Sequence, residues 1–325
     1  MGLKVFLESS IMQKGKAATA GSKMLAGFIA PVDATVVELL EAAGVEIAGR
    51  IEIGEFGVEG LFGEIELTEA VNGADVVLCN DYTGAISCAA AAAGLYYVHP
   101  TYGTVSRYGL IQSVSSMDQI GVLCKNPEDG FKVLEIIQGY DEKDGVMQVG
   151  HTPGHTPFGL RKSPKIPFGL RKSPKIPDPL TTFTTMQILC CGEIANNISK
   201  YDGVKYGYRA EGYEGLQELY AKSRTEAFGE DVKLAAILGA MVLSQENYVR
   251  YYDKAMRVRR MIGDSLEFDE CDVMKTQSPV ISRLCGLPSL TTPGAIYIAK
   301  PGCEGALVSA SMTGACPPVI KGGGV

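Results

Sequence analysis

The residues best suited to chemistry in this sequence lie in one short stretch that begins at Asp81. The stretch reads Asp81-Tyr82-Thr83-Gly84-Ala85-Ile86-Ser87, and Cys88 follows it directly. A serine or cysteine becomes a nucleophile for acyl transfer when a histidine base lies within hydrogen-bond reach. His99 is the next histidine along the chain, so Ser87 or Cys88 could react in this way only if the fold brings His99 back to them. The alternative is structural, with Cys88 and the alanines after it packing a short helix against a sheet.

The elements that must position this stretch have the signals of an α/β protein. The apolar spacing predicts a helix over 35–43, ended by Gly44, and then a buried strand over 45–53. Asn126 is expected to cap another helix, which Pro127 begins and Gly139 ends. A long helix is predicted from about Asp231 to Ile262. Its spacing gives one face with four apolar side chains, Leu234, Ile237, Leu238 and Met241.

The segment after His99 has a recognisable pattern. It reads Thr101-Tyr102-Gly103-Thr104-Val105-Ser106-Arg107-Tyr108-Gly109-Leu110 and continues through Ser115-Ser116-Met117-Asp118-Gln119-Ile120-Gly121. Together with the Asp81 stretch it resembles the amidase signature family, and most of all its glutamyl-tRNA amidotransferase branch. The resemblance spans three blocks, roughly 17–57, 76–145 and 193–262. It implies a single α/β domain over 1–325 with an amidase-signature-like mixed, mostly parallel central sheet flanked by helices.

The resemblance also locates the family's catalytic positions, and all three are changed. The serine of the family segment D-T-G-G-S-I-R is the nucleophile, and counting from Asp81 places Ala85 there. The catalytic lysine of the segment K-D-N-I corresponds to Glu8, and the Gly/Ser-rich stretch with the bridging serine is missing before Asp81. Alanine has no oxygen with which to attack, so the resemblance implies no catalytic residues here. Glu8 could still act as a general base if its pKa were raised, or it could be an ordinary glutamate at a strand end.

Two further positions match residues that hold glutamine in the amidotransferase branch. They are Tyr206, in a Tyr-Gly-Tyr segment, and Arg259, in a Val-Arg-Arg segment. With Asp81, Gly84 and Cys88 they would form a residual pocket for a carboxylate or amino acid, because an arginine fork suits a carboxylate. Alternatively, Tyr206 is a core residue and Arg259 makes an ion pair at a helix end.

Residues at about 146–180 differ in kind from the rest. The ten residues from Pro157 to Ile166 repeat without change as Pro167 to Ile176. The repeat is basic and proline-rich, which predicts a loop insertion that is either solvated or docks on an acidic partner or RNA. His151 and His155 precede it, but Pro153 and Gly154 between them preclude a helical pair, and no metal site is expected.

The composition limits the classes of function. The chain has 325 residues, 46% of them hydrophobic, with a net charge of −7. The negative charge argues against direct nucleic-acid binding, and no apolar run reaches the ~20 residues that a membrane span needs. Nine cysteines without C-x-x-C spacing favour reduced thiols in a cytoplasmic protein. No cofactor is expected.

The leading hypothesis is therefore a catalytically degenerate amidase-signature protein that works as a binding, scaffold or assembly subunit, through self-association or a protein partner. The competing hypothesis is an enzyme, with residual amidase or amidotransferase activity or with new chemistry in a remodelled pocket. A third hypothesis, a component of a tRNA-amidating complex, requires an ammonia source that the sequence does not reveal.

Overall fold

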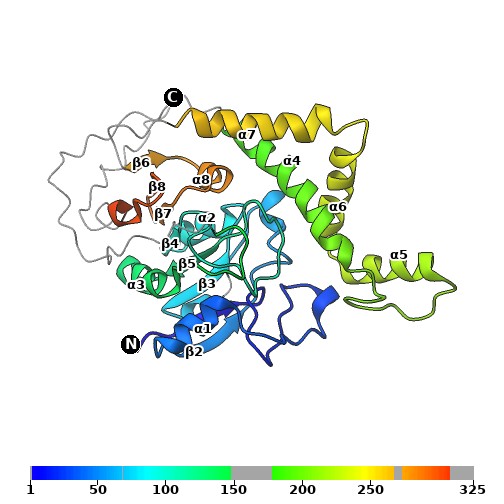
Figure 1. The fold of residues 1–325 in the computed structure, drawn as a ribbon, viewed down its shortest axis with the longest axis horizontal. Coiled ribbons are helices and arrows are strands. Elements are labelled where there is room, and N and C mark those ends of the chain that lie inside the picture. The colour runs from blue at the N-terminus through cyan, green and yellow to red at the C-terminus, as the bar shows by residue number, and fades with distance from the viewer. Residues whose placement is uncertain (1, 68, 148–177, 267–272, 308–325) are drawn as a thin grey trace.

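A mixed sheet forms the centre of the molecule in the computed structural model, which describes residues 2–67, 69–147, 178–266 and 273–307 (Figure 1). The strands are β1 (Val5–Glu8), β2 (Ile47–Ile51), β3 (Val76–Asn80), β4 (Tyr96–His99), β5 (Ile120–Cys124), β6 (Val273–Thr276), β7 (Ser289–Thr292) and β8 (Ala295–Ala299). The α-helices are α1 (Thr35–Ala42), α2 (Ala85–Ala92), α3 (Pro127–Ile137), α4 (Pro179–Asn197), α5 (Leu216–Ala227), α6 (Glu230–Leu243), α7 (Lys254–Asp264) and α8 (Val280–Cys285).

The strand order confirms the mixed α/β sheet flanked by helices and corrects one detail. The order is β2-β1-β3-β5-β4-β7-β8-β6. Only β1 pairs in parallel, with β2 and β3, while the other five strand pairs are antiparallel. The expectation of a mostly parallel sheet was wrong. A parallel pair needs a crossover such as α1 between β1 and β2, whereas the tight turn from Thr292 to Ala295 makes β7 and β8 antiparallel.

The two faces of the sheet are both covered, as the alternation of side chains along β3 requires. Val76 and Leu78 point to the face covered by α1 and α3, and Val77 and Cys79 point to the face that α2 covers. All four side chains are buried. This arrangement fixes the carboxyl end of β3, from which the Asp81 stretch continues.

The locally encoded elements match their predictions. The helix expected over 35–43 is α1, and the strand expected over 45–53 contains β2. Asn126 caps α3, because its side chain accepts a hydrogen bond of 3.0 Å from the backbone N–H of Glu128. Pro127 is the first residue of that helix, and the helix ends two residues before Gly139.

The long helix predicted from Asp231 to Ile262 is two helices instead. After α6 the backbone of Ser244 is extended, with ψ of 149°, and one π-helical turn at Val249–Asp253 leads into α7. The two helices run in different directions (Figure 1). An extended residue cannot continue the i to i−4 hydrogen bonds, so the chain changes direction there.

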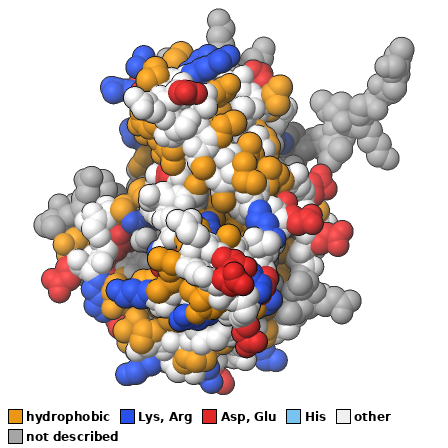
Figure 2. Space-filling view, turned by 90° about the vertical axis from the view of Figure 1, so that its right-hand side faces the viewer, with side chains coloured by type: hydrophobic (Ala, Val, Ile, Leu, Met, Phe, Trp, Pro, Cys, Tyr) orange, Lys and Arg blue, Asp and Glu red, His pale blue; other side chains and the backbone are white. Residues whose placement is uncertain are grey.

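Helix α6 packs on α4 through its small residues. A Cβ atom on Gly239 would lie 2.0 Å from the carbonyl oxygen of Cys191, so only glycine allows this approach. Of the four large apolar side chains on the predicted face of α6, Leu238 packs against the core and the other three point outward. Leu234, Ile237 and Met241 are 42%, 67% and 44% exposed, and hydrophobic side chains gather on this side of the molecule (Figure 2).

The loop insertion and the expected absence of a membrane span can be compared with the structure only over the described residues. Most of the loop insertion at 146–180, with His151 and His155, lies outside them, although Pro179 and Leu180 belong to the first turn of α4. Within the described ranges, no helix is both long enough and apolar enough to cross a membrane.

Candidate functional site

Asp81 lies at the centre of a buried polar cluster between β3 and α2. Its Oδ1 accepts hydrogen bonds from the backbone N–H groups of Gly84 (2.8 Å) and Ile86 (3.2 Å). Its Oδ2 accepts from the backbone N–H (2.9 Å) and the hydroxyl (2.6 Å) of Ser87. A carboxylate at this position satisfies the free N–H groups of the first turn of α2 and complements the helix dipole.

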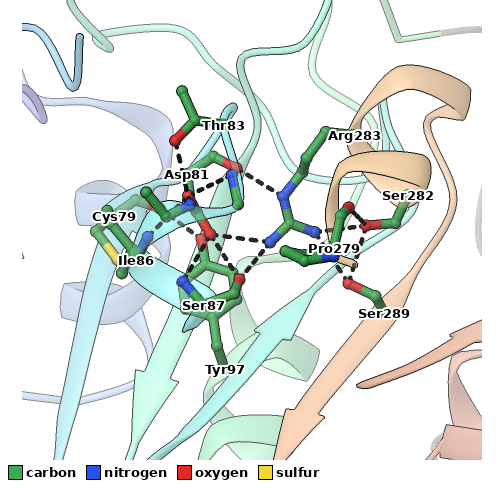
Figure 3. Close-up of polar contacts among 12 residues, drawn as sticks. Cys79, Asp81, Thr83, Ile86, Ser87, Tyr97, Pro279, Ser282, Arg283 and Ser289 are labelled. Carbon is green, nitrogen blue, oxygen red and sulfur yellow. Dashed lines mark hydrogen bonds and ion pairs between the residues drawn. The ribbon is translucent and has the colours of Figure 1, made fainter. Parts of the chain in front are cut away.

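Arg283, from α8, completes the cluster from the other end of the chain (Figure 3). Its Nη2 lies 2.9 Å from Oδ2 of Asp81, and its Nε donates to the backbone oxygen of Asp81 at 2.7 Å. Nη1 donates to the hydroxyls of Ser282 (2.7 Å) and Ser289 (2.9 Å), and the guanidinium lies 5.5 Å from the ring centre of Tyr97. The side chains of Asp81 and Arg283 are both 0% exposed. The polar side-chain atoms of Asp81 and Arg283 are thus all hydrogen-bonded to other residues or to each other.

Glu8, at the position of the family lysine, is a buried carboxyl group at the end of β1. Its Oε2 accepts a hydrogen bond of 2.7 Å from the backbone N–H of Asn80. Burial raises the pKa of Glu8 to about 7, although the Asn80 N–H opposes the shift. No described residue forms an ion pair with it. The nearby Arg50 donates instead to the backbone oxygen of Ile11, at 2.7 Å.

Ala85, at the position of the family nucleophile, begins α2 and faces a closed space. The cavity beside it has a volume of about 10 Å³, which is room for no more than one water molecule. A methyl group on Gly60 would lie 2.6 Å from Cβ of Ala85. Gly84, with φ of +85°, is covered by Pro279, whose Cγ lies 2.5 Å from the position a Cβ would take. This cavity is too small to hold an amide substrate.

The structure does not assemble the alternative nucleophile and base. The hydroxyl of Ser87 is held by Asp81 and Arg283. Cys88 is exposed on α2, and partial burial together with Asp81 raises the pKa of its thiol, which is the opposite of activation. His99 is buried in β4, and burial followed by the charge of Arg283 lowers its pKa well below 6.5. Its Nδ1 has no hydrogen-bond partner among the described residues.

The remaining predicted pocket residues lie apart from this cluster. Arg259 is engaged in structural contacts, because it donates to the backbone oxygens of Leu284 (2.6 Å) and Ser116 (3.0 Å) and to the hydroxyl of Ser116 (2.9 Å). Tyr206 is 52% exposed and lines a different cavity of about 700 Å³, to which Arg259 and Asp81 do not contribute. Within the described residues, no group of three or more potential metal ligands is gathered.

Arg283 and the larger cavity are the two features that sequence reasoning missed. One signal for Arg283 is available in hindsight. The family segment D-T-G-G-S-I-R ends in an arginine, and Ser87 stands at that position. The local cation is therefore gone from a helix start that keeps its buried aspartate, and this chain places another arginine there from a distant element.

The fold and the position of this altered site define an amidase-like protein, and comparison with known families agrees. A family model described as Amidase matches residues 1–60 and 70–167. Together with the relatives described next, this match shows that the chain belongs to the amidase family.

Individual relatives narrow the comparison to one group, the A subunits of glutamyl-tRNA(Gln) amidotransferases. The A subunit from Wolinella succinogenes is 33% identical over 350 aligned positions, which cover 91% of this chain and 77% of that protein. Its counterpart from Lachnoclostridium phytofermentans is 31% identical, with 91% and 71% covered. The alignment to the first is longer than the 325-residue chain, so this chain lacks segments that the relative has.

Solved structures share the fold at lower sequence identity. A peptide amidase bound to chymostatin has a TM-score of 0.70 at 19% identity, over 96% of this chain and 83% of that one. The A subunit of the glutamyl-tRNA(Gln) amidotransferase from Thermotoga maritima has a TM-score of 0.59 at 20% identity, over 94% and 81%.

Proposed function

We propose that this protein is an amidase-family member without amidase activity, which works by binding other molecules as a scaffold or assembly subunit. The observation that carries the proposal is the closed space beside Ala85, with about 10 Å³ where a nucleophile and substrate would have to meet. Loss of a serine nucleophile alone lowers turnover by roughly a millionfold in a serine hydrolase. The carboxyl group of Glu8 in place of the lysine offers no proton relay of the family kind.

Turnover measurements test the catalytic half of the proposal. Purified protein is incubated with glutamine, asparagine and simple aliphatic amides, with the peptide amidase as a positive control and the Ala85→Ser variant beside the wild type. We expect no ammonia release above the uncatalysed rate from either form, because a restored hydroxyl would still lack both its base and room for a substrate. Hydrolysis by the wild type well above the uncatalysed rate would overturn it, and loss of that hydrolysis in the Glu8→Gln variant would assign the activity to Glu8.

The binding half rests on the exposed apolar face of α6. Monomeric proteins keep few large apolar side chains together at the surface, and such patches commonly mark interfaces. Leu234, Ile237 and Met241 are all more than 40% exposed on one side of this helix. The curated relatives are named as subunits, so a protein partner or a second copy of this chain is the expected occupant.

The oligomeric state and the partners can be measured on the same helix. Light scattering after size exclusion, and affinity capture with mass spectrometry, are compared for the wild type, Ile237→Glu and Ala240→Glu. Both variants add one carboxylate to an exposed position of α6. We expect Ile237→Glu to dissociate the complex and Ala240→Glu to affect it less. A wild type that is monomeric and captures no stoichiometric partner would contradict the proposal.

A further inference from the structure

A second cavity lies away from the Asp81 cluster and has the size of a small-molecule site. It lies between the short 3-10 helix Lys23–Leu25, the segment 110–112 and the segment 200–208, and its volume is about 700 Å³. Small-molecule sites typically measure about 300 to 1,000 Å³. It shares no lining residue with the small cavity beside Ala85.

The floor of this cavity is apolar and fixed in place. Met24, Leu25, Ile111 and Tyr201 line it and are each no more than 6% exposed. The backbone N–H of Tyr208 donates to the carbonyl oxygen of Met24 at 2.8 Å, which ties two walls together. The space is therefore built into the fold, and its floor suits an apolar ligand body.

The rim carries positive charge only. Lys23, Lys200 and Lys205 line the cavity, and no aspartate or glutamate does. Each ammonium lies over a tyrosine ring, at 4.5 Å from the centre of Tyr208, 5.2 Å from Tyr201 and 5.3 Å from Tyr206 respectively. This local positive charge contrasts with the net charge of −7 of the whole chain.

These ammonium groups lack carboxylate partners. In the part of the chain that the structure describes, none of the three lysines forms an ion pair. Two carboxylates in the neighbouring segments are used elsewhere, since Glu226 accepts from the hydroxyl of Tyr208 and Asp202 accepts from the backbone N–H groups of Val204 and Lys205. Lys23 does donate to the backbone oxygen of Glu226 at 3.3 Å. An anion entering the cavity would still meet three ammonium groups without a carboxylate partner, and no acidic residue lines the walls.

We propose that this cavity binds an organic carboxylate with an aromatic or aliphatic body, the carboxylate at the Lys23, Lys200 and Lys205 rim and the body on the Met24 floor. Burial lowers the pKa of Lys200, and the charge of Asp118 opposes that shift. The cavity is separate from the site at Ala85, so this proposal and the proposed function can be tested independently.

Binding of 4-phenylbutyrate tests the proposal, with 4-phenylbutanol as the neutral comparison. Isothermal titration calorimetry of the full chain is expected to give one site with a low millimolar Kd for the acid and binding several-fold weaker for the alcohol. Lys200→Gln and Lys205→Gln should each raise the Kd of the acid by about 2- to 5-fold and leave the Kd of the alcohol unchanged. Lys254→Gln, an exposed lysine on α7 that does not line the cavity, is the control and should change neither.

A steric variant locates the ligand without removing charge. Gly27 lines the cavity, and a Cβ there would meet no atom within 4 Å, so Gly27→Trp adds bulk without backbone strain. It should abolish binding of the acid. Equal affinity for acid and alcohol, no saturable binding of the acid, or binding that neither Gly27→Trp nor the lysine variants affect would each overturn the proposal.

Discussion

Removal of Arg283 should destabilise the protein far more than removal of a surface arginine with the same ion-pair geometry. Arg283 and Arg257 each place a guanidinium nitrogen within 3 Å of an aspartate oxygen, at 2.9 Å from Asp81 and 2.8 Å from Asp253. The two pairs differ in burial, because the Arg283 side chain is 0% and the Arg257 side chain 74% exposed.

The magnitude follows from what each substitution leaves behind. Arg283→Met leaves the Asp81 carboxylate buried without its cation, which typically costs about 3 to 5 kcal/mol. It also removes the Arg283 donor from the hydroxyls of Ser282 and Ser289, and leaves Ser289 only the 3.2 Å hydrogen bond from Ser282. Arg257→Met leaves an aspartate that water can solvate, so less than about 1 kcal/mol is expected.

Urea unfolding followed by far-ultraviolet circular dichroism measures both variants, since the chain contains no tryptophan for fluorescence. The double variant Asp81→Asn with Arg283→Met keeps the test decisive if the single variant is too unstable to purify. Removing both charges should recover part of the loss, with a coupling energy of about 2 kcal/mol. Equal costs for Arg283→Met and Arg257→Met would refute the reasoning.

Two other predictions concern Glu8 and Cys88. The folded-state pKa of Glu8, about 7, is above its ordinary value of 4.5, so its stabilising contribution is complete below pH 4.5 and is lost as the pH rises through 7. Over that range the wild type should lose about 3 kcal/mol of unfolding free energy that Glu8→Gln does not lose, and parallel profiles in urea titrations would contradict this. The thiol of Cys88 is exposed but has a raised pKa, so iodoacetamide should alkylate it more slowly at neutral pH than free cysteine. Faster alkylation, or an activity lost in Cys88→Ala, would instead favour the enzyme hypothesis.

Local signals allowed much of the fold to be predicted. The helix α1, the strand β2 and the capped start of α3 depend on neighbours within a few residues, such as Asn126 and Glu128, and each was anticipated. The failures are non-local. The antiparallel pairs of the sheet depend on which strands meet, and the exposure of Ile237 depends on the approach of α6 to α4 at Gly239.

The candidate site shows the same division. Counting from Asp81 placed Ala85 at the nucleophile position, and the small residues after it predicted the short helix that Ala85 begins. The resemblance around Ser22 and Lys23 placed Glu8, which lies at the end of β1. The contact between Asp81 and Arg283 could not be predicted in this way, because no pattern in the intervening chain specifies it. Nor could the resemblance separate Tyr206 from Arg259, since their family roles implied one pocket and the structure holds each among different neighbours.

The contact between Asp81 and Arg283 also sets an order of events during synthesis. The two residues are 202 positions apart, and a ribosome that adds about 5 to 20 residues per second needs about 10 to 40 s to make that length. During this interval the nascent chain can form β1, β2 and β3 but must keep the aspartate without its cation. The ion pair that compensates the buried carboxylate of Asp81 can therefore form only after α8 has been synthesised.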